Sequence, residues 1–439
     1  MVRIRHQVFL IILTTITVIS IPVVVSPTQK AGKFEIEQWR EVLRDVKREL
    51  KSSYYDPEFH GMNIESRFEL ADAKMKTAES LGQLVGIVAQ VLIDLNDSHT
   101  LFVPPFNATR VEYGWLLQPV GSECYVAAVR PGSDAEAKGL RVGDKVLSID
   151  GRPLDRTKVW LANYLYYMLR PQSFVTLVVE NPEKHVRQIV IKSRVREGSA
   201  ILTGHSLQEF DLDVAEERRL GRHRFYEPNE QVLIWKMPAF ELSEDELASK
   251  FGKLKNRRAL ILDLRGNPGG YVSVLEQFAG YFFDSNIKLA DLHGRKKFEP
   301  MIAKSRKEKA FKGELIVLID GDSASAAEVF ARVVQLEKRG IIVGDRSSGS
   351  VMQSRYYPLK LGVGKSLIFG ISATEADVVM DDGKSLENVG VIPNELMLPT
   401  PQDISMHYDP VLSHAAALVG LKLDPKKAGE LFPVEWNSR

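Results

Sequence analysis

The stretch Leu262–Gly270 reads LDLRGNPGG, and it decides the class of fold. It continues the apolar run Ala259–Leu264, which predicts a buried strand, and it ends in a glycine-rich turn before a helical run from Ser273. Such a turn leaves backbone N–H groups free at a helix start, where they can hold developing negative charge, bind a phosphate or merely turn the chain. The order of strand, turn and helix is therefore predicted, while the chemistry of the turn stays open.

A second stretch, Leu318–Ala331, reads LIDGDSASAAEVFA and has the same order of strand, sharp turn and helix. A serine at such a junction projects its hydroxyl from the sheet edge, and the first helical N–H groups favour an oxyanion beside it. From this segment alone, Ser323 and Ser325 are explained equally well as helix caps. The segment indicates a candidate nucleophile without deciding for one.

Three continuous apolar runs, Gln231–Met237, Ala259–Leu264 and Glu314–Ile319, are each followed by a helical segment. This alternation predicts an α/β fold, a layered βαβ core with a buried sheet. Helical spacing of apolar residues over Phe34–Leu50 predicts an amphipathic helix near the start of the chain. Further helices are predicted over Leu84–Leu95 and Ile404–Val419.

Between Val111 and Val195 the pattern changes to short β-type runs, and within it residues 129–151 read VRPGSDAEAKGLRVGDKVLSIDG. A helical turn capped by Ser133, a tight Gly-Asp turn and a strand ending in Asp-Gly follow in that order, and this order closely resembles a PDZ domain. PDZ domains bind the C-terminal carboxylate of a chain and add its last residues as a strand. The resemblance places the peptide-binding loop near Gly114, Trp115 and Leu116.

Taken together, the two strand-turn-helix segments resemble the catalytic core of the C-terminal processing peptidases and their tricorn-core relatives. The resemblance covers about Phe34–Pro399 and implies a crotonase-like layered core with a PDZ domain inserted before it. It implies that Ser325 is the nucleophile and that Ser323 is a cap. It also implies an oxyanion hole formed by the N–H of Gly269 or Gly270 and by that of Ala326.

The expected general base of the lysine-type processing peptidases is missing. Their lysine stands in a Gly-Lys-Gly segment about 25 residues after the nucleophile, but here the chain has no lysine between Lys338 and Lys360. A serine hydroxyl is a poor nucleophile without a positioned base. The tricorn-type relatives use a Ser-His pair ahead of the PDZ region instead, and Ser98 and His99 stand in that place.

In those relatives a distant glutamate completes the arrangement, and the resemblance assigns it to Glu387, with Glu375 as an alternative. Its role would be to hold Ser98 and thereby the orientation of His99. Gln353 is a possible supporting residue because it lies near the place of the family's lysine. A neutral imidazole can accept a proton from Ser325 and return it to the leaving amine.

The predicted organisation has six parts, with an export signal at the start. Arg3 and Arg5 precede the apolar stretch Val8–Val25, which predicts an exported protein, with an uncleaved membrane anchor as the alternative. The expected parts are 1–32 signal peptide or anchor, 33–106 helical N-terminal region, 107–196 PDZ domain, 197–228 charged linker, 229–400 peptidase core and 401–439 helical tail.

Composition excludes some classes of function. Lys and Arg number 58 against 57 Asp and Glu, so no strong field favours nucleic acid. A single cysteine, Cys124, excludes an internal disulfide framework, and no cofactor or metal is expected. Expected partners are protein substrates whose C-terminal ends engage the PDZ domain, with possible membrane association through the N-terminal segment and a possible homo-oligomer.

The predicted function is that of an exported serine endopeptidase acting near the C-termini of protein substrates. Two alternatives remain at this point. One is a catalytically inactive binding or scaffold protein that keeps the fold and the PDZ groove. The other is an acyl-transfer enzyme acting on thioesters, against which the PDZ domain argues because it has no evident use for an acyl-CoA.

Overall fold

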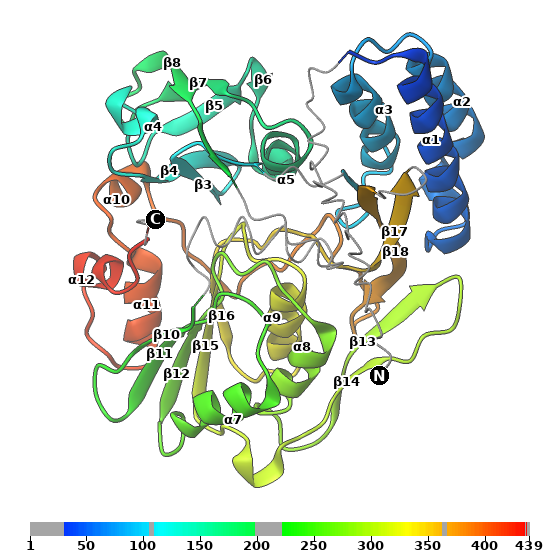
Figure 1. Ribbon diagram of the computed structural model, residues 1–439. Helices are drawn as coiled ribbons and strands as arrows, with labels where there is room; N and C mark the ends of the chain where they lie inside the picture. Colours follow the sequence, from blue (N-terminus) through cyan, green and yellow to red (C-terminus); the bar gives the residue numbers. More distant parts are fainter. Residues whose placement is uncertain (1–29, 105–108, 198–221, 362–366, 435, 437–439) are drawn as a thin grey trace, which may run out of the picture.

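The computed structural model describes residues 30–104, 109–197, 222–361, 367–434 and 436 (Figure 1). Residues 1–29, which include the apolar stretch of the predicted export signal, lie outside the described residues. Within the described ranges, no helix has both the length and the apolar character needed to cross a membrane.

The core is built on a mostly parallel sheet with helices on both faces (Figure 1). Strand β10 is antiparallel to β11, and all the other neighbours in the order β10-β11-β12-β15-β16-β19 are parallel. The strands are β10 (Arg224–Tyr226), β11 (Val232–Lys236), β12 (Ala259–Asp263), β15 (Glu314–Ile319), β16 (Ile341–Gly344) and β19 (Glu395–Leu396).

The two faces of this sheet are buried in separate apolar clusters. Leu233 and Trp235 of β11 face the cluster under α7 (Glu244–Gly252), α8 (Val272–Ala279) and α9 (Ala326–Leu336). The alternate residues Val232 and Ile234 face α11 (Pro410–Leu418) and α12 (Pro425–Glu430). Burial of both faces explains why these strands are continuously apolar in sequence.

A second sheet carries the N-terminal helices. Its strands are β1 (Leu101–Val103), β18 (Leu367–Val379), β13 (Ile287–Gly294) and β14 (Met301–Ala303), and β17 (Met352–Leu361) pairs with β18. Trp39 of α1 packs on Phe102 and Phe369, which fixes the helical region on this sheet. The helices are α1 (Lys33–Ser53), η1 (Phe59–Gly61), α2 (Ile64–Met75) and α3 (Leu81–Ile93), while η4 (Lys307–Lys309) is an exposed turn between β14 and β15.

The segment that resembles a PDZ domain forms a separate antiparallel sheet above the core (Figure 1). The predicted cap is present, because the Ser133 hydroxyl accepts a hydrogen bond from the Glu136 N–H at the start of α4. The elements are β2 (Thr109–Glu112), β3 (Trp115–Val120), β4 (Glu123–Val129), α4 (Asp134–Ala137), β5 (Lys145–Ile149), β6 (Arg152–Pro153), η2 (Arg156–Lys158), α5 (Val159–Asn163), the π-helical η3 (Tyr164–Leu169), β7 (Phe174–Glu180), β8 (Val186–Lys192) and β9 (Arg194–Glu197).

Two details differ from the sequence-based expectations. The helix predicted over Ile404–Val419 is two helices, α10 (Pro401–Ser405) and α11, because Asp409 and Pro410 form the N-cap and first position of a new helix. The end of the predicted linker forms β10, since Phe225 stacks on the buried Trp235 with ring centroids 5.3 Å apart.

Candidate active site

Ser325 stands at the sharp turn between β15 and α9, with φ 53° and ψ −120°. A non-glycine residue in this region of backbone space is strained, and such strain is common where a side chain is held for a function. The Ser325 N–H donates to the carbonyl of Ser350 at 2.9 Å and to Oε2 of Glu328 at 3.1 Å. These bonds hold the strained residue from two sides.

The glycine-rich turn lies directly against Ser325. The Ala324 N–H donates to the carbonyl of Asn267 at 2.9 Å, and a Cβ atom added to Gly269 would lie 2.6 Å from the Cβ of Ser325. A Cβ on Gly270 would lie 2.4 Å from the Phe240 carbonyl oxygen. The close approach of the two turns therefore depends on both glycines.

The candidate oxyanion donors differ in whether their N–H groups already donate a hydrogen bond within the protein. The Gly269 N–H donates to Oδ1 of Asn267 at 2.8 Å, so it is already used. Within the described part of the chain, the structure contains no acceptor for the N–H of Gly270 or of Ala326, and Ala326 is the first residue of α9. Of the two predicted glycines, Gly270 is therefore the better donor.

Ser98, His99 and Glu387 are joined by hydrogen bonds. The Ser98 hydroxyl lies 2.7 Å from Nδ1 of His99 and donates to Oε2 of Glu387 at 2.9 Å. The Ser98 N–H donates to Oε1 of the same carboxylate at 2.9 Å. The loop that carries Ser98 and His99 is fixed because β1, which follows it, pairs with β18.

The segment Asp345–Val351, hereafter the 345–351 loop, connects this set to Ser325. The Val351 N–H donates to Oε2 of Glu387 at 2.8 Å, and the Ser350 carbonyl accepts from the Ser325 N–H. Among the described residues no hydrogen bond joins the His99 ring to the Ser325 hydroxyl. Such contacts are often long in unliganded enzymes and tighten when substrate binds.

Burial changes the protonation of the ionisable groups here. Desolvation lowers the pKa of His99 below its usual value, against the opposing charge of Asp97, so the imidazole is neutral at neutral pH. Desolvation also raises the pKa of Glu387 to about 7, although its hydrogen bonds from Ser98 and Val351 favour the charged form. A neutral imidazole can act as a proton acceptor.

Two buried carboxylates were missed by the sequence analysis. Glu328 is fully buried and accepts from the Ser347 hydroxyl at 2.6 Å, the Gly349 N–H at 2.7 Å and the Ser350 N–H at 2.9 Å. Desolvation raises the pKa of Glu328 to about 7. Its spacing from Ser325, Ser-x-x-Glu, is a capping-box signal that could have identified it.

Asp97 is the second missed carboxylate, and it is only 2% exposed. Its Oδ1 accepts from the His99 N–H at 2.9 Å, the Thr100 N–H at 3.0 Å and the Thr374 hydroxyl at 2.8 Å. It therefore shapes the turn that presents His99. An aspartate that accepts bonds from N–H groups two and three residues ahead is typical of an Asx turn, which is the local signal for it.

Three other predicted residues lie elsewhere or act differently. Glu375 accepts hydrogen bonds from Tyr357 and Lys296, and no contact with Ser98 is present in the described structure. Gln353 pairs with Ala376 across β17 and β18, and it stays a prediction. Ser323 does not cap α9, because its buried hydroxyl donates to the Leu264 carbonyl at 2.9 Å and ties the two turns together.

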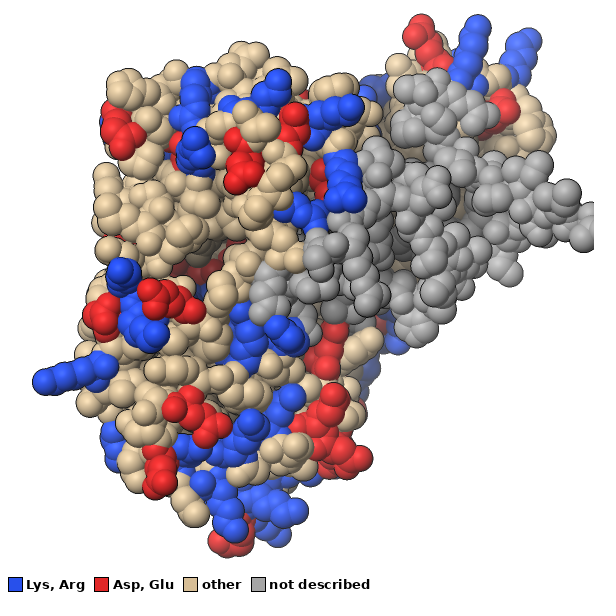
Figure 2. Space-filling view, turned by 60° about the vertical axis from the view of Figure 1, so that its left-hand side comes forward, with Lys and Arg blue, Asp and Glu red and all other residues tan. Residues whose placement is uncertain are grey.

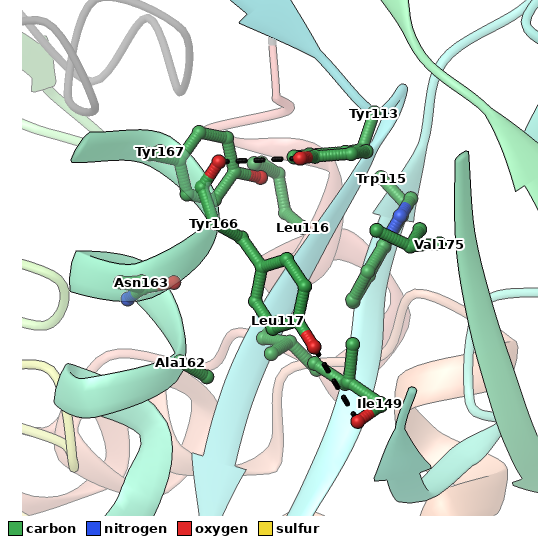
Figure 3. Close-up of a pocket in the computed structure, with 10 residues that line it drawn as sticks. All are labelled: Tyr113, Trp115, Leu116, Leu117, Ile149, Ala162, Asn163, Tyr166, Tyr167 and Val175. Atoms are coloured by element: carbon green, nitrogen blue, oxygen red, sulfur yellow. Dashed lines mark hydrogen bonds between the residues drawn. The ribbon is translucent and has the colours of Figure 1, made fainter. Parts of the chain in front are cut away.

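A second candidate site is a groove in the PDZ-like domain between β3 and the helical segment α5–η3 (Figure 3). Its volume is only about 20 Å³, so the groove is narrow, and its walls are mainly apolar. Trp115 and Leu116 of the predicted loop line it, whereas Gly114 lines the neighbouring hollow. Tyr166 spans the groove, with its hydroxyl 3.5 Å from the Ile149 carbonyl (Figure 3).

Comparison with known proteins agrees with this arrangement. The model of peptidase family S41 matches residues 231–397, and a PDZ domain model matches residues 125–180. Residues 231–397 therefore form a peptidase family S41 domain. The chain is a serine-type peptidase of the C-terminal processing kind with a PDZ domain, as the resemblance implied.

Curated proteins similar to the chain are proteases by name. A carboxyl-terminal-processing protease of Picosynechococcus is 24% identical over 400 residues, which cover 87% of this chain and 88% of the relative. A tail-specific protease of Haemophilus influenzae is 26% identical over 317 residues, covering 66% of this chain and 42% of the relative. A putative tricorn protease homolog of Streptomyces coelicolor is 24% identical, covering 87% of this chain and 32% of that protein.

Solved structures share the fold. Mature CPAF complexed with lactacystin has a TM-score of 0.63 at 17% identity, covering 84% of this chain and 95% of that one. The photosystem II D1 C-terminal processing protease has a TM-score of 0.54 at 18% identity, covering 90% and 99% of the two chains. The layered core with a PDZ domain and a helical N-terminal region is therefore confirmed as the fold.

Proposed function

We propose that Ser325 is the nucleophile of this peptidase and that His99 is its general base. The observation that carries the proposal is the bonded set of Ser98, His99 and Glu387, which the 345–351 loop connects to the strained turn at Ser325. The set accounts for catalysis in a chain that has no lysine at the expected place. It supplies the base that a serine hydroxyl needs.

In the proposed mechanism the Ser325 hydroxyl attacks the peptide carbonyl while Nε2 of His99 takes the proton. Nδ1 faces the Ser98 hydroxyl, which Glu387 orients, so Nε2 is the nitrogen left for Ser325. The N–H groups of Gly270 and Ala326 stabilise the tetrahedral oxyanion. His99 then gives its proton to the leaving amine, and water hydrolyses the acyl-enzyme by the same route.

The PDZ groove would hold the C-terminal end of the substrate and present an upstream bond to Ser325. Apolar walls formed by Trp115, Leu117 and Val175 favour an apolar terminal side chain. Charges of both signs are interspersed over the face shown in Figure 2, so steering of an acidic or basic substrate is not part of the proposal. We also propose export through the N-terminal segment, with the body of the protein outside the cytoplasm.

The test is cleavage of peptides by the purified protein, together with labelling by a fluorophosphonate probe. We expect Ser325→Ala to abolish both, and His99→Ala to reduce both by a factor of about 1000 or more. Cleavage at the wild-type rate by Ser325→Ala would refute the proposal, and labelling that survives the loss of His99 would assign the base to another residue. Absence of both activities in the wild type would favour the rival reading, an inactive scaffold protein.

A further inference from the structure

A short segment of the core, residues 239–242 between β11 and α7, lies alongside the glycine-rich turn of the active site. The Phe240 N–H donates to the Gly269 carbonyl at 2.7 Å, and the Phe240 carbonyl accepts from the Tyr271 N–H at 3.0 Å. These two bonds form a parallel bridge between Phe240 and Gly270. The segment is therefore held against the turn that carries the proposed oxyanion donor.

Glu241 follows Phe240 in this segment, and the register of the bridge places it beside Tyr271. Phe240 and Leu242 are buried in the core, whereas Glu241 between them is partly exposed. Since successive side chains along a bridged segment point to opposite sides, Glu241 faces away from the core. Tyr271 is 45% exposed. A carboxylate and an aromatic ring, both reachable from solvent, thus stand next to Gly270.

The Glu241 carboxylate is not used within the protein. In the described part of the chain it makes no hydrogen bond or ion pair, whereas Glu244 pairs with Arg306 at 3.0 Å and Glu246 accepts from the Ser243 hydroxyl at 2.9 Å. Burial raises the pKa of Glu241, and no cation among the described residues offsets that shift. A partly desolvated carboxylate without a counter-charge is unfavourable, and a cation brought by a ligand relieves this.

The position of Glu241 suits a basic side chain of the substrate. The P1 residue of a peptide is the one whose carbonyl is attacked, and the proposed mechanism binds that carbonyl oxygen at the Gly270 N–H. The side chains of P1 and of its neighbours then lie within reach of the residues beside Gly270. A lysine or arginine there can lay its apolar stem on the Tyr271 ring and bring its charge to Glu241.

We propose that Glu241 is a specificity-determining residue, which selects substrates with a lysine or arginine next to the scissile bond. This role rests on the proposed function of Ser325 as the nucleophile and of Gly270 as an oxyanion donor. It acts by direct contact and not by long-range steering. It is separate from the apolar C-terminal end proposed for the PDZ groove, so a good substrate carries two signals at different distances from the cleaved bond.

The test uses one peptide made with lysine, or with its uncharged analogue norleucine, at P2, P1 or P1′. The ratio of kcat/KM for the lysine form to that for the norleucine form is measured for the wild type, Glu241→Gln and Glu241→Lys. Glu244→Gln is the matched control, because it removes an exposed carboxylate three residues further along the chain. Binding of the same peptides to Ser325→Ala and to Ser325→Ala/Glu241→Gln gives a second readout that needs no cleavage.

We expect the wild type to favour lysine at one of these positions by about tenfold or more, the usual size of a hydrogen bond to a charged group. Glu241→Gln should bring the ratio close to unity, and Glu241→Lys should bring it below unity because like charges then meet. Glu244→Gln should keep the wild-type ratio.

A ratio that Glu241→Gln leaves unchanged, an equal change in Glu244→Gln, or no preference for lysine at any position would overturn the proposal. If the wild type cleaves no peptide, the proposed function fails. The affinities of the two Ser325→Ala proteins for the lysine and norleucine peptides then still decide the role of Glu241.

Discussion

At the residue scale, Gly270 is held against the Phe240 carbonyl, and its N–H faces no acceptor within the described structure. We expect Gly270→Ala to displace the turn and lower kcat about 100-fold to 1000-fold, the usual effect of losing one oxyanion donor. Gly252→Ala is the matched control, because a Cβ there meets no atom within 4 Å. Steady-state kinetics of the two variants provide the measurement, and equal losses in both would contradict the assignment of Gly270.

Glu387 and Glu375 are distinguished by their contacts. Glu387 accepts three hydrogen bonds, two from Ser98 and one from Val351, and an amide has only one acceptor oxygen to offer them. We expect Glu387→Gln to lower kcat by at least about 100-fold, because the orientation of His99 is lost. Glu375→Gln should stay close to the wild type, and a larger loss in Glu375→Gln than in Glu387→Gln would reverse the assignment.

Some of these residues could be found from sequence and others could not. The turns that carry Gly270 and Ser325 are local patterns, so they could be recognised directly. His99 and Glu387 are far apart in the chain, and only the resemblance to a family joined them to Ser325. Asp97 also binds the hydroxyl of the distant Thr374, and Glu328 binds the N–H of the distant Gly349, and only the folded structure brings these groups together.

At the scale of elements, the α5–η3 segment of the PDZ domain forms one wall of the apolar groove. Tyr166 spans the groove, and its segment ends in a π-helical turn, a form often found at functional sites. We expect Tyr166→Ala to change KM for peptides with an apolar C-terminus by about tenfold or less, because a groove is altered and no catalytic group is lost. The kcat for a short peptide lacking such an end should stay unchanged, and a fall in that kcat would contradict separate roles for groove and active site.

Apolar periodicity predicted the buried strands correctly, but it did not reveal a break between two helices or a short edge strand. The buried parallel strands were correctly predicted because both of their faces are apolar. The prediction of one continuous helix over Ile404–Val419 was wrong, because apolar residues keep a helical spacing across the break at Asp409 and Pro410. Strand β10 was missed because only Phe225 of its short run is strongly apolar, and its stability comes from stacking on Trp235.

At the scale of the whole molecule, burial of Glu328 links stability to pH. Its pKa of about 7 in the folded protein exceeds its usual value of 4.5, so between these values the folded state binds more protons than the unfolded state. The stabilisation is therefore complete below about pH 4.5 and is lost as the pH rises toward 7. Between about pH 4.5 and pH 7, the contribution of Glu328 to the free energy of unfolding falls by about 1.4 kcal/mol per pH unit.

Glu328→Gln should remove this slope, because the amide resembles the protonated acid and does not titrate. Urea unfolding of both proteins at pH 5, 6 and 7 gives the comparison, and the free energy of unfolding of the wild type should fall more steeply toward pH 7. Parallel curves, or a steeper fall in the variant, would show that Glu328 does not titrate in this way. The measurement needs no activity, so it stands apart from the catalytic assignments.

The most direct test of the catalytic assignment is a crystal structure of the protein inhibited by a peptidyl phosphonate. We predict a covalent bond to Oγ of Ser325 and Nε2 of His99 about 2.6 to 3.2 Å from that oxygen. We also predict a phosphonate oxygen about 2.7 to 3.1 Å from the N–H groups of Gly270 and Ala326. An adduct on another residue, or a His99 ring that stays beyond hydrogen-bond reach of the modified serine, would contradict the catalytic assignment.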